Sequence, residues 1–256
     1  MVTKGEDEGR GFRTVQIGSG RVVRSGEETR FVLDPTNGGY SNAQIDNYTG
    51  LRRSQFTCEA PIRLSLRAWA SHEAAALRGT WGFGFWNQPY LPGGGLPRLP
   101  RYVWFFGGGS PHHMAFVRGV PGDGWKASTA DFTRPGFVLL APGAPLGFLL
   151  MRVPGLYRRL WGIAQTAIGA AEAVIPQDLR QPQGYTLEWL RDRVCFYVGK
   201  ELILESPFTP RGKLGLVIWM DNQYAIITPQ GKFGFGLVSM AEKQWLAVDE
   251  LQLERL

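Results

Sequence analysis

Flat aromatic side chains are the most prominent groups in this sequence that could hold a ligand. The chain carries nine Trp among 256 residues, and the C–H faces of sugar rings stack on such rings. Trp86, Tyr102, Trp104 and Trp219 lie in short strand-like segments, where alternate side chains fall on one face. We predict that these four residues bind a ligand. The alternative is burial in the core, because aromatic rings dominate core packing.

Amides and carboxyls near these rings could orient the hydroxyl groups of a sugar. Asp221, Asn222 and Gln223 follow Trp219 at once and supply hydrogen-bond donors and acceptors. The alternative is a turn in which Asp and Asn bond their own backbone. The predicted ligand-binding residues are Gln44, Trp86, Asn87, Tyr102, Trp104, Trp219, Asn222 and Gln223.

Four titratable residues could supply acid and base chemistry in such a cleft. Asp46 and Asp221 are the candidates for a carboxylate pair, and His112 and His113 follow a Gly-rich segment. Adjacent side chains point apart in an extended segment, so the two His cannot readily chelate one ion. No His-x-His, His-Glu-x-x-His or Cys-x-x-Cys occurs, so we predict neither a metal site nor a cofactor.

Glycine and proline indicate which elements carry these residues. The chain has 34 Gly and 17 Pro, which disfavours a helical bundle and suits short strands joined by turns. Residues 62–69 alternate apolar and polar side chains as a half-buried strand does. In residues 80–87 the same period sets Gly82 and Gly84 on one shallow face that a flat ligand could approach. Further strands are predicted at residues 102–106, 137–140, 148–152, 185–189, 194–198, 201–205, 214–220, 224–228, 233–238 and 245–253.

One segment has helical rather than strand periodicity. Apolar residues recur at helical spacing between Gly155 and Val174, bounded by Pro154 and Pro176. We predict one amphipathic helix that packs on the sheets. A lid, an interface and a membrane contact through residues 137–175 are the alternatives.

Charge and patterning restrict the partners. The net charge is +6, but the basic residues are scattered and form no nucleic-acid motif, so no nucleic-acid partner is predicted. The first ten residues are polar and lack the apolar segment of a secretory signal, which makes a cytoplasmic location our expectation. The sequence leaves the oligomeric state open.

Three stretches carry motifs of interest: residues 77–86, Leu-Arg-Gly-Thr-Trp-Gly-Phe-Gly-Phe-Trp, residues 185–202, which begin Tyr-Thr-Leu-Glu-Trp, and residues 248–253, Val-Asp-Glu-Leu-Gln-Leu. In this order they resemble the Gly-Thr-Trp-Pro-Ala-Phe-Trp strand, the Tyr-x-x-Glu-Trp hairpin and the closing strand of family 16 glycoside hydrolases. That family belongs to the concanavalin A-like lectin and glucanase superfamily. The resemblance implies a β-jelly roll whose concave sheet carries a saccharide-binding cleft.

One departure from the family pattern bears on activity. Family hydrolases carry Glu-x-Asp-x-x-Glu on the strand that follows, where alternation aims the carboxylates into the cleft. Residues 102–107 of this chain read Tyr-Val-Trp-Phe-Phe-Gly at the corresponding place, and that acidic spacing occurs nowhere in the sequence. Neither the nucleophile nor the acid carries over.

We therefore predict an all-β, two-sheet antiparallel jelly-roll sandwich with one inserted amphipathic helix. Residues 1–30 would form a tail and edge strands, and residues 31–256 a single domain with the helix at about 155–174. The predicted function is carbohydrate binding without the usual catalysis. The alternative is an enzyme (a glycoside hydrolase, lyase or cyclase) with Asp46, His112, His113 and Asp221 as its acid and base set.

Overall fold

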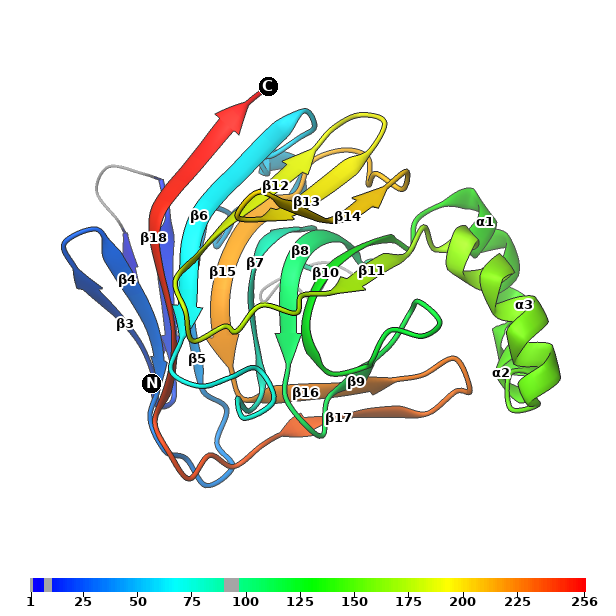
Figure 1. Ribbon diagram of the computed structural model, residues 1–256, viewed down its shortest axis with the longest axis horizontal. Helices are drawn as coiled ribbons and strands as arrows, with labels where there is room; N and C mark the ends of the chain where they lie inside the picture. The colour runs from blue at the N-terminus through cyan, green and yellow to red at the C-terminus, as the bar shows by residue number, and fades with distance from the viewer. Residues whose placement is uncertain (1, 7–10, 90–96) are drawn as a thin grey trace.

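Alternating apolar residues build two large antiparallel sheets that curve around one another (Figure 1). The computed structural model describes residues 2–6, 11–89 and 97–256. The inner, concave sheet has the strand order β1-β2-β5-β15-β7-β8-β10-β11. Its strands are β1 (Val2–Glu6), β2 (Arg13–Ile17), β5 (Asn42–Asp46), β7 (Thr80–Trp86), β8 (Arg101–Gly108), β10 (Gly124–Asp131), β11 (Ala171–Val174) and β15 (Gly215–Asp221).

The outer sheet covers the convex side of the inner one. Its order is β14-β13-β12-β6-β18-β4-β3, and all its pairings are antiparallel. This arrangement is a two-sheet antiparallel jelly-roll sandwich, which confirms the predicted fold class. The strands are β3 (Gly20–Ser25), β4 (Glu28–Leu33), β6 (Ile62–Ala70), β12 (Gln183–Trp189), β13 (Val194–Val198), β14 (Glu201–Ser206) and β18 (Gln244–Arg255).

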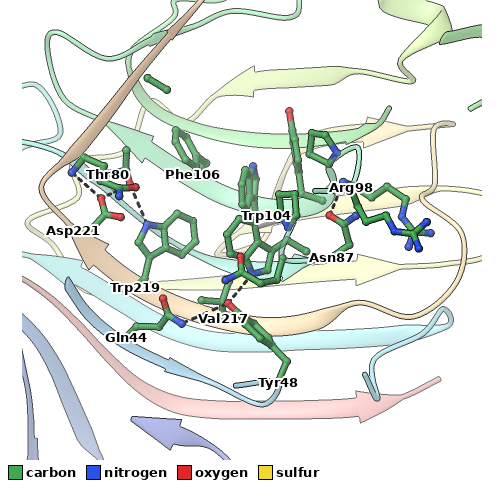
Figure 2. Close-up of a pocket in the computed structure, with 18 of the residues that line it drawn as sticks. Gln44, Tyr48, Thr80, Asn87, Arg98, Trp104, Phe106, Val217, Trp219 and Asp221 are labelled. Atoms are coloured by element: carbon green, nitrogen blue, oxygen red, sulfur yellow. Dashed lines mark hydrogen bonds between the residues drawn. The ribbon is translucent and has the colours of Figure 1, made fainter. Parts of the chain in front are cut away.

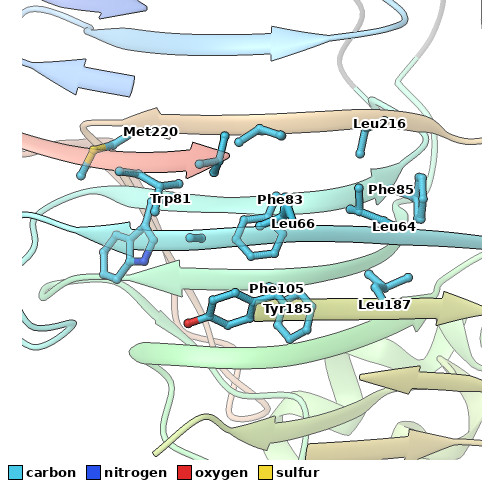
Figure 3. Close-up of a cluster of buried hydrophobic side chains, with 14 of the residues drawn as sticks. Leu64, Leu66, Trp81, Phe83, Phe85, Phe105, Tyr185, Leu187, Leu216 and Met220 are labelled. Atoms are coloured by element: carbon cyan, nitrogen blue, oxygen red, sulfur yellow. The ribbon is translucent and has the colours of Figure 1, made fainter. Parts of the chain in front are cut away.

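The core lies between the two sheets (Figure 3). Trp81, Phe83 and Phe85 of β7 point into it, as the period of two predicts, and none is exposed to solvent. Phe83 contacts the ring of Phe105 on β8 at 5.2 Å and that of Tyr185 on β12 at 5.3 Å. The opposite faces of β7 and β8 are therefore left for the concave side.

A small third sheet lies across the open side of the concave sheet (Figure 1). It consists of β9 (His113–Met114), β16 (Gln223–Ile227) and β17 (Phe233–Leu237). β16 pairs with β17 in antiparallel and with β9 in parallel orientation. The β16–β17 hairpin and the β9 segment thus form one wall beside the concave face.

Three helices follow β10, and here two strand predictions are wrong. Residues 137–140 and 148–152 were predicted as strands, but the chain forms α1 (Pro135–Leu140) and α2 (Ala144–Leu150). The short apolar runs carry no period of their own, and a Pro stands in the first turn of each helix, where its missing N–H costs nothing. Single 3-10 turns occupy Arg53–Gln55 and Ala141–Gly143.

The predicted amphipathic helix is present as α3 (Pro154–Ala167), but it ends seven residues before the predicted Val174. Gly169 adopts φ +55°, and the N–H groups of Gly169 and Ala170 close the helix on the carbonyls of Thr166 and Gln165. Residues 171–174 then join the concave sheet as β11. Among the described residues, no helix has the length and apolarity needed to cross a membrane.

The first 30 residues contribute β1, β2, β3 and the start of β4. β1 is an edge strand of the inner sheet, and β3 is an edge strand of the outer sheet. Residues 1 and 7–10 of the expected tail lie outside the described residues.

Candidate functional site

The concave sheet lines a cleft of about 2040 Å³ whose floor is aromatic (Figure 2). Tyr102, Trp104 and Phe106 alternate along β8 and all face this cleft. The ring of Trp104 lies 4.3 Å from that of Tyr102 and 5.1 Å from that of Phe106. On the strand to which the resemblance assigns the family's carboxylates, the side chains that face the cleft are therefore aromatic.

Trp219 and Trp86 extend the floor on both sides of Trp104. The ring of Trp219, on β15, lies 5.4 Å from Trp104 and 5.9 Å from Phe106. Trp86, at the end of β7, lies 5.8 Å from Trp104 and donates its indole N–H to the Tyr48 hydroxyl at 2.7 Å. Because the rings cover one another, Tyr102, Trp104, Phe106 and Trp219 are only 4% to 8% exposed, while Trp86 is half-buried.

Two glycines on β7 make room for the indoles. Gly82 lies opposite Trp219 and Gly84 opposite Trp104 in the strand register. A Cβ on Gly82 would lie 3.0 Å from the Trp219 ring, and one on Gly84 2.5 Å from the Trp104 Cα. The shallow face expected at these glycines is therefore filled by the protein's own rings, so a ligand would meet the rings rather than the β7 backbone.

Asp221 forms a polar end to the aromatic floor. The Thr80 hydroxyl donates to its Oδ1 at 2.7 Å and the Gln223 N–H donates to the same atom at 3.1 Å. The Trp219 indole N–H donates to the Thr80 hydroxyl at 3.1 Å, which links the carboxyl to the floor (Figure 2). Burial raises the pKa of Asp221 from 3.8 to about 6. This carboxyl can therefore exchange a proton near neutral pH.

His112 lines the same cleft with one nitrogen unused. Its Nδ1 accepts the Ala225 N–H at 3.2 Å, its ring lies 5.2 Å from that of Phe106, and its buried Nε2 has no partner. Burial lowers the pKa of His112 to about 3, and the nearby charges of Lys126 and His113 act in the same direction. The imidazole is thus neutral at physiological pH.

Cations gather at the opposite end of the cleft. Among the described residues that line it, Asp221 is the single acidic one. The Arg53 guanidinium donates to the carbonyls of Gln88 and Pro89, and burial, together with the charge of Arg98, lowers the Arg53 pKa. The cations that line this end are Arg52, Arg53, Arg98, Arg101 and Lys213.

Of the four predicted catalytic residues, the structure brings Asp221 and His112 to the cleft. Asp46, at the end of β5, is fully buried, does not line the cleft, and accepts bonds from the Gln44 amide and from the backbone of Tyr48 and Thr49. Its carboxylate already has its partners, so the expectation of an Asp46–Asp221 pair in the cleft is wrong. His113 is exposed and lies outside the lining, because adjacent side chains of β9 point apart.

Of the eight predicted ligand-binding residues, seven line the cleft and Asn222 does not. The Asn222 side chain accepts the Ser41 N–H and donates to the carbonyls of Gly39 and Val238, so it holds loops together. Asn87 lines the cleft, but its amide donates to the Leu99 carbonyl and accepts the Arg101 N–H at the start of β8. The other six are Gln44, Trp86, Tyr102, Trp104, Trp219 and Gln223.

Several residues that line the cleft were not predicted from the sequence. Thr80 and Phe106 lie on predicted strands at positions whose alternation with Trp86 and Trp104 points to the cleft. The alternation of these two strands therefore carries the signal that identifies both residues. Tyr48 and the cations come from loops whose approach to the cleft follows no periodic pattern.

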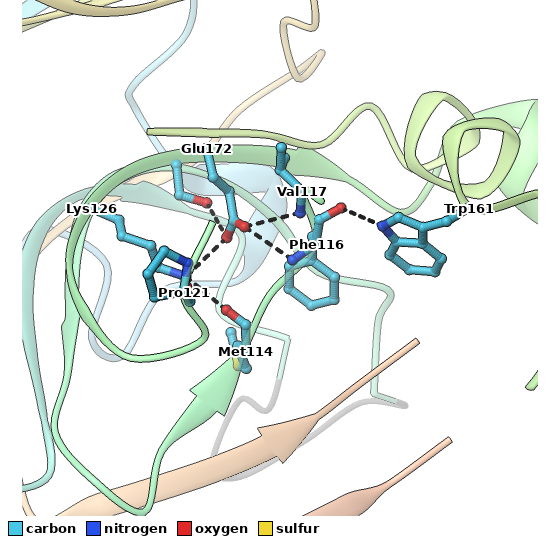
Figure 4. A network of polar contacts seen from close by, with 8 residues as sticks. Met114, Phe116, Val117, Pro121, Lys126, Trp161 and Glu172 are labelled. Carbon is cyan, nitrogen blue, oxygen red and sulfur yellow. Dashed lines mark hydrogen bonds and ion pairs between the residues drawn. The ribbon is translucent and has the colours of Figure 1, made fainter. Parts of the chain in front are cut away.

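A buried ion pair anchors the loop between β9 and β10, which lies beside the cleft (Figure 4). Lys126 Nζ donates to the carbonyl of Met114 at 2.7 Å and to Glu172 Oε1 at 3.4 Å. Glu172 Oε2 accepts the N–H groups of Phe116 and Val117. The Phe116 carbonyl accepts the Trp161 indole N–H at 3.1 Å, so β10, β11, this loop and α3 are held as one unit.

Within the part of the chain that the structure describes, no three His, Cys, Asp or Glu side chains form a metal-binding group.

Comparisons with known proteins give structural similarity without sequence similarity. No protein-family model and no curated protein matches the chain. Bacillus licheniformis β-glucanase is similar over 100% of this chain and 91% of its own, with a TM-score of 0.48 and 8% identity. A laminarinase from Flavobacterium sp. UMI-01 is similar over 91% of this chain and 81% of its own, with a TM-score of 0.48 and 11% identity.

A sialidase is similar over 98% of this chain, with a TM-score of 0.44 and 8% identity, but this chain spans only 18% of that protein. The jelly-roll assignment rests on the strand order described above.

Proposed function

We propose that this protein binds a saccharide in the cleft of its concave sheet and does not hydrolyse it by the mechanism of family 16 glycoside hydrolases. The observation that carries the proposal is the aromatic floor formed by Tyr102, Trp104, Phe106 and Trp219 with Trp86 at its edge. Sugar rings present flat C–H faces, and a continuous apolar floor in an open cleft suits the stacking of such faces.

The polar groups around the floor support the same ligand class. Gln44, Gln223 and Asp221 line the cleft and offer donors and acceptors for hydroxyl groups. At the other end, Arg98 and Lys213 offer charged donors. Their position supports a saccharide that carries a carboxylate or sulfate at this end.

The test is binding to an array of neutral and acidic glycans, followed by calorimetry with those that bind. Trp86 is half-buried at the edge of the floor, and its indole N–H bonds the Tyr48 hydroxyl. Trp86→Ala should weaken binding at least about tenfold, or about 1.4 kcal/mol, because a stacking ring is lost.

Trp69→Ala is the matched control. Trp69 is also half-buried, but it lies on β6 of the outer sheet, so its removal should leave the affinity unchanged. Absence of binding to every glycan, or an equal loss in both variants, would refute the proposal.

A second candidate function is acid-base catalysis in the same cleft. The observation that favours it is the carboxyl of Asp221, whose pKa lies at about 6 at one end of the floor. His112 lies in the same lining, and because its Nδ1 accepts the Ala225 N–H, its neutral ring carries the proton on Nε2, which can donate to a ligand.

Mass spectrometry of a bound oligosaccharide distinguishes the two candidates. Hydrolysis adds one water per bond cleaved, whereas elimination gives an unsaturated product of unchanged total mass. Asp221→Asn keeps an oxygen for the Thr80 and Gln223 bonds and should abolish turnover while leaving binding intact. An unchanged oligosaccharide, or full turnover by this variant, would exclude Asp221 catalysis.

A further inference from the structure

The helical segment carries apolar side chains that the sandwich does not cover. Figure 1 shows α1, α2 and α3 beyond the edge of the sheets, with the β16–β17 turn beside α2. Trp161 is the one residue of the three helices that is buried. Seven large apolar residues between Val138 and Ile163 are exposed: Val138, Leu139, Leu140, Leu146, Leu149, Val153 and Ile163.

The turn of the β16–β17 hairpin continues this surface. The rings of Phe148 and Phe233 are in contact, with centroids 5.3 Å apart, and the Arg152 guanidinium donates to the Gln230 carbonyl at 3.3 Å. Phe233 is itself 57% exposed. We call the exposed residues of α1–α3 together with Phe233 the docking surface.

The shape of the docking surface argues against a flat protein partner. Val138, Leu139 and Leu140 are consecutive in α1 and are 53%, 80% and 46% exposed. Consecutive residues of a helix are about 100° apart, so these three cover an arc of roughly 200°. A rigid partner contacts one stripe of a helix, whereas the fluid interface of a bilayer can surround a protruding one.

The charge of the docking surface selects the kind of bilayer. Residues 132–171 contain Arg134, Arg152, Arg158 and Arg159 and no Asp or Glu, and residues 222–241 contain Lys232 and no acid. Arg152, Arg158 and Arg159 are exposed, and none of the ion pairs found in the described residues involves them. Apolar side chains flanked by unpaired cations match an anionic lipid surface.

We propose that the docking surface binds peripherally to membranes that contain anionic lipids, with the leucines of α1 and α2 inserted among the lipids and Arg152, Arg158 and Arg159 against their headgroups. Pairing with a second copy is disfavoured, because a two-fold contact would bring these arginines together without an acidic partner. The Trp161 bond to the Phe116 loop holds α3 on the sandwich, so binding would require no refolding of the helices.

Vesicle co-sedimentation of the full chain tests this proposal. The protein should sediment with vesicles of phosphatidylcholine and phosphatidylserine, and much less with phosphatidylcholine alone. Leu139→Asp with Leu146→Asp should reduce the partition coefficient at least tenfold, because two inserted side chains are lost. Arg158→Glu with Arg159→Glu should reduce it by about fivefold or more for each charge removed.

The controls carry changes of the same kind on surfaces away from the helices. Val23→Asp with Leu202→Asp alters two residues that are each 46% exposed on the outer sheet, and Arg191→Glu reverses an exposed charge there. Both controls should sediment as the unaltered protein does, and circular dichroism should show every variant folded. Failure of the unaltered protein to bind either kind of vesicle would overturn the proposal. So would loss of binding in the controls, or a dimer that the leucine variant converts to a monomer.

Discussion

Replacing Asp221 by Asn should remove a defined part of the pH dependence of this protein's stability. The carboxyl titrates near 3.8 when exposed and at about 6 in the folded protein, because it is buried. Between these pH values the folded state binds more protons than the unfolded state. The contribution of Asp221 is therefore fully present below about pH 4 and is lost as the pH rises through 6.

The size of the effect follows from the shift. Two pKa units correspond to about 3 kcal/mol, which is the stability that the ionised carboxyl removes above its folded pKa. Asn has no charge to bury, and its oxygen can still accept the bonds from Thr80 and Gln223. We expect the stability of Asp221→Asn relative to the unaltered protein to rise by about 3 kcal/mol between pH 4 and pH 8.

Urea unfolding followed by Trp fluorescence at a series of pH values measures this difference. Taking the difference between the two proteins cancels the titration of other groups, including His112, which acts with the opposite sign. The change of the difference with pH is the test, since its absolute value also contains the cost of burying an amide. A difference that stays constant from pH 4 to pH 8 would refute the buried-carboxyl reasoning.

Three further changes test other parts of the structure. Gly84→Ala would set a Cβ 2.4 Å from the Val103 carbonyl oxygen at φ +148° and should cost more than about 3 kcal/mol, whereas Gly143→Ala, in open space, should change the unfolding midpoint little. Lys126→Met should cost about 3–5 kcal/mol in urea unfolding, because Glu172 would stay buried without its cation; no loss would show that the pair does not stabilise the loop. The unaltered protein should lose stability as the pH falls from 6.5 towards 3, since the pKa of His112 is lowered to about 3. His112→Phe should remove this part of the acid-induced loss, and an unchanged dependence of stability on acid pH would contradict this.

The sequence predicted the sandwich well because its strands are half-buried and alternate. Residues 62–69 and 194–198 appear as β6 and β13 with bounds that differ by at most one residue. Strand β10 was missed because Trp125 is its single large apolar residue, so its alternation is weak. Lys126 and Ser128 are buried on the concave side because Glu172 gives both of them a partner, and no local pattern records such a partner.

The candidate site was predictable where it follows from the period of a strand. Tyr102, Trp104 and Trp219 face the cleft by alternation alone. Asp46 and Asn222 do not line the cleft, because both side chains bond the backbone. Asp46 accepts the N–H of Tyr48, two residues away, and Asn222 accepts the N–H of Ser41, which is distant in the sequence. Such partners depend on the path of loops, and polar residue type alone does not distinguish an available group from a satisfied one.

The match between Gly82 and Gly84 and the indoles above them has a consequence for anyone who would install hydrolytic chemistry on this scaffold. Writing carboxylates at Trp104 and Phe106 would take bulk away from a strand whose partners on β7, Gly84 and Gly82, have no side chains to replace it. Each new acid would stand beside an empty space on its β7 side and lack packing there. A graft would have to rebuild both strands together.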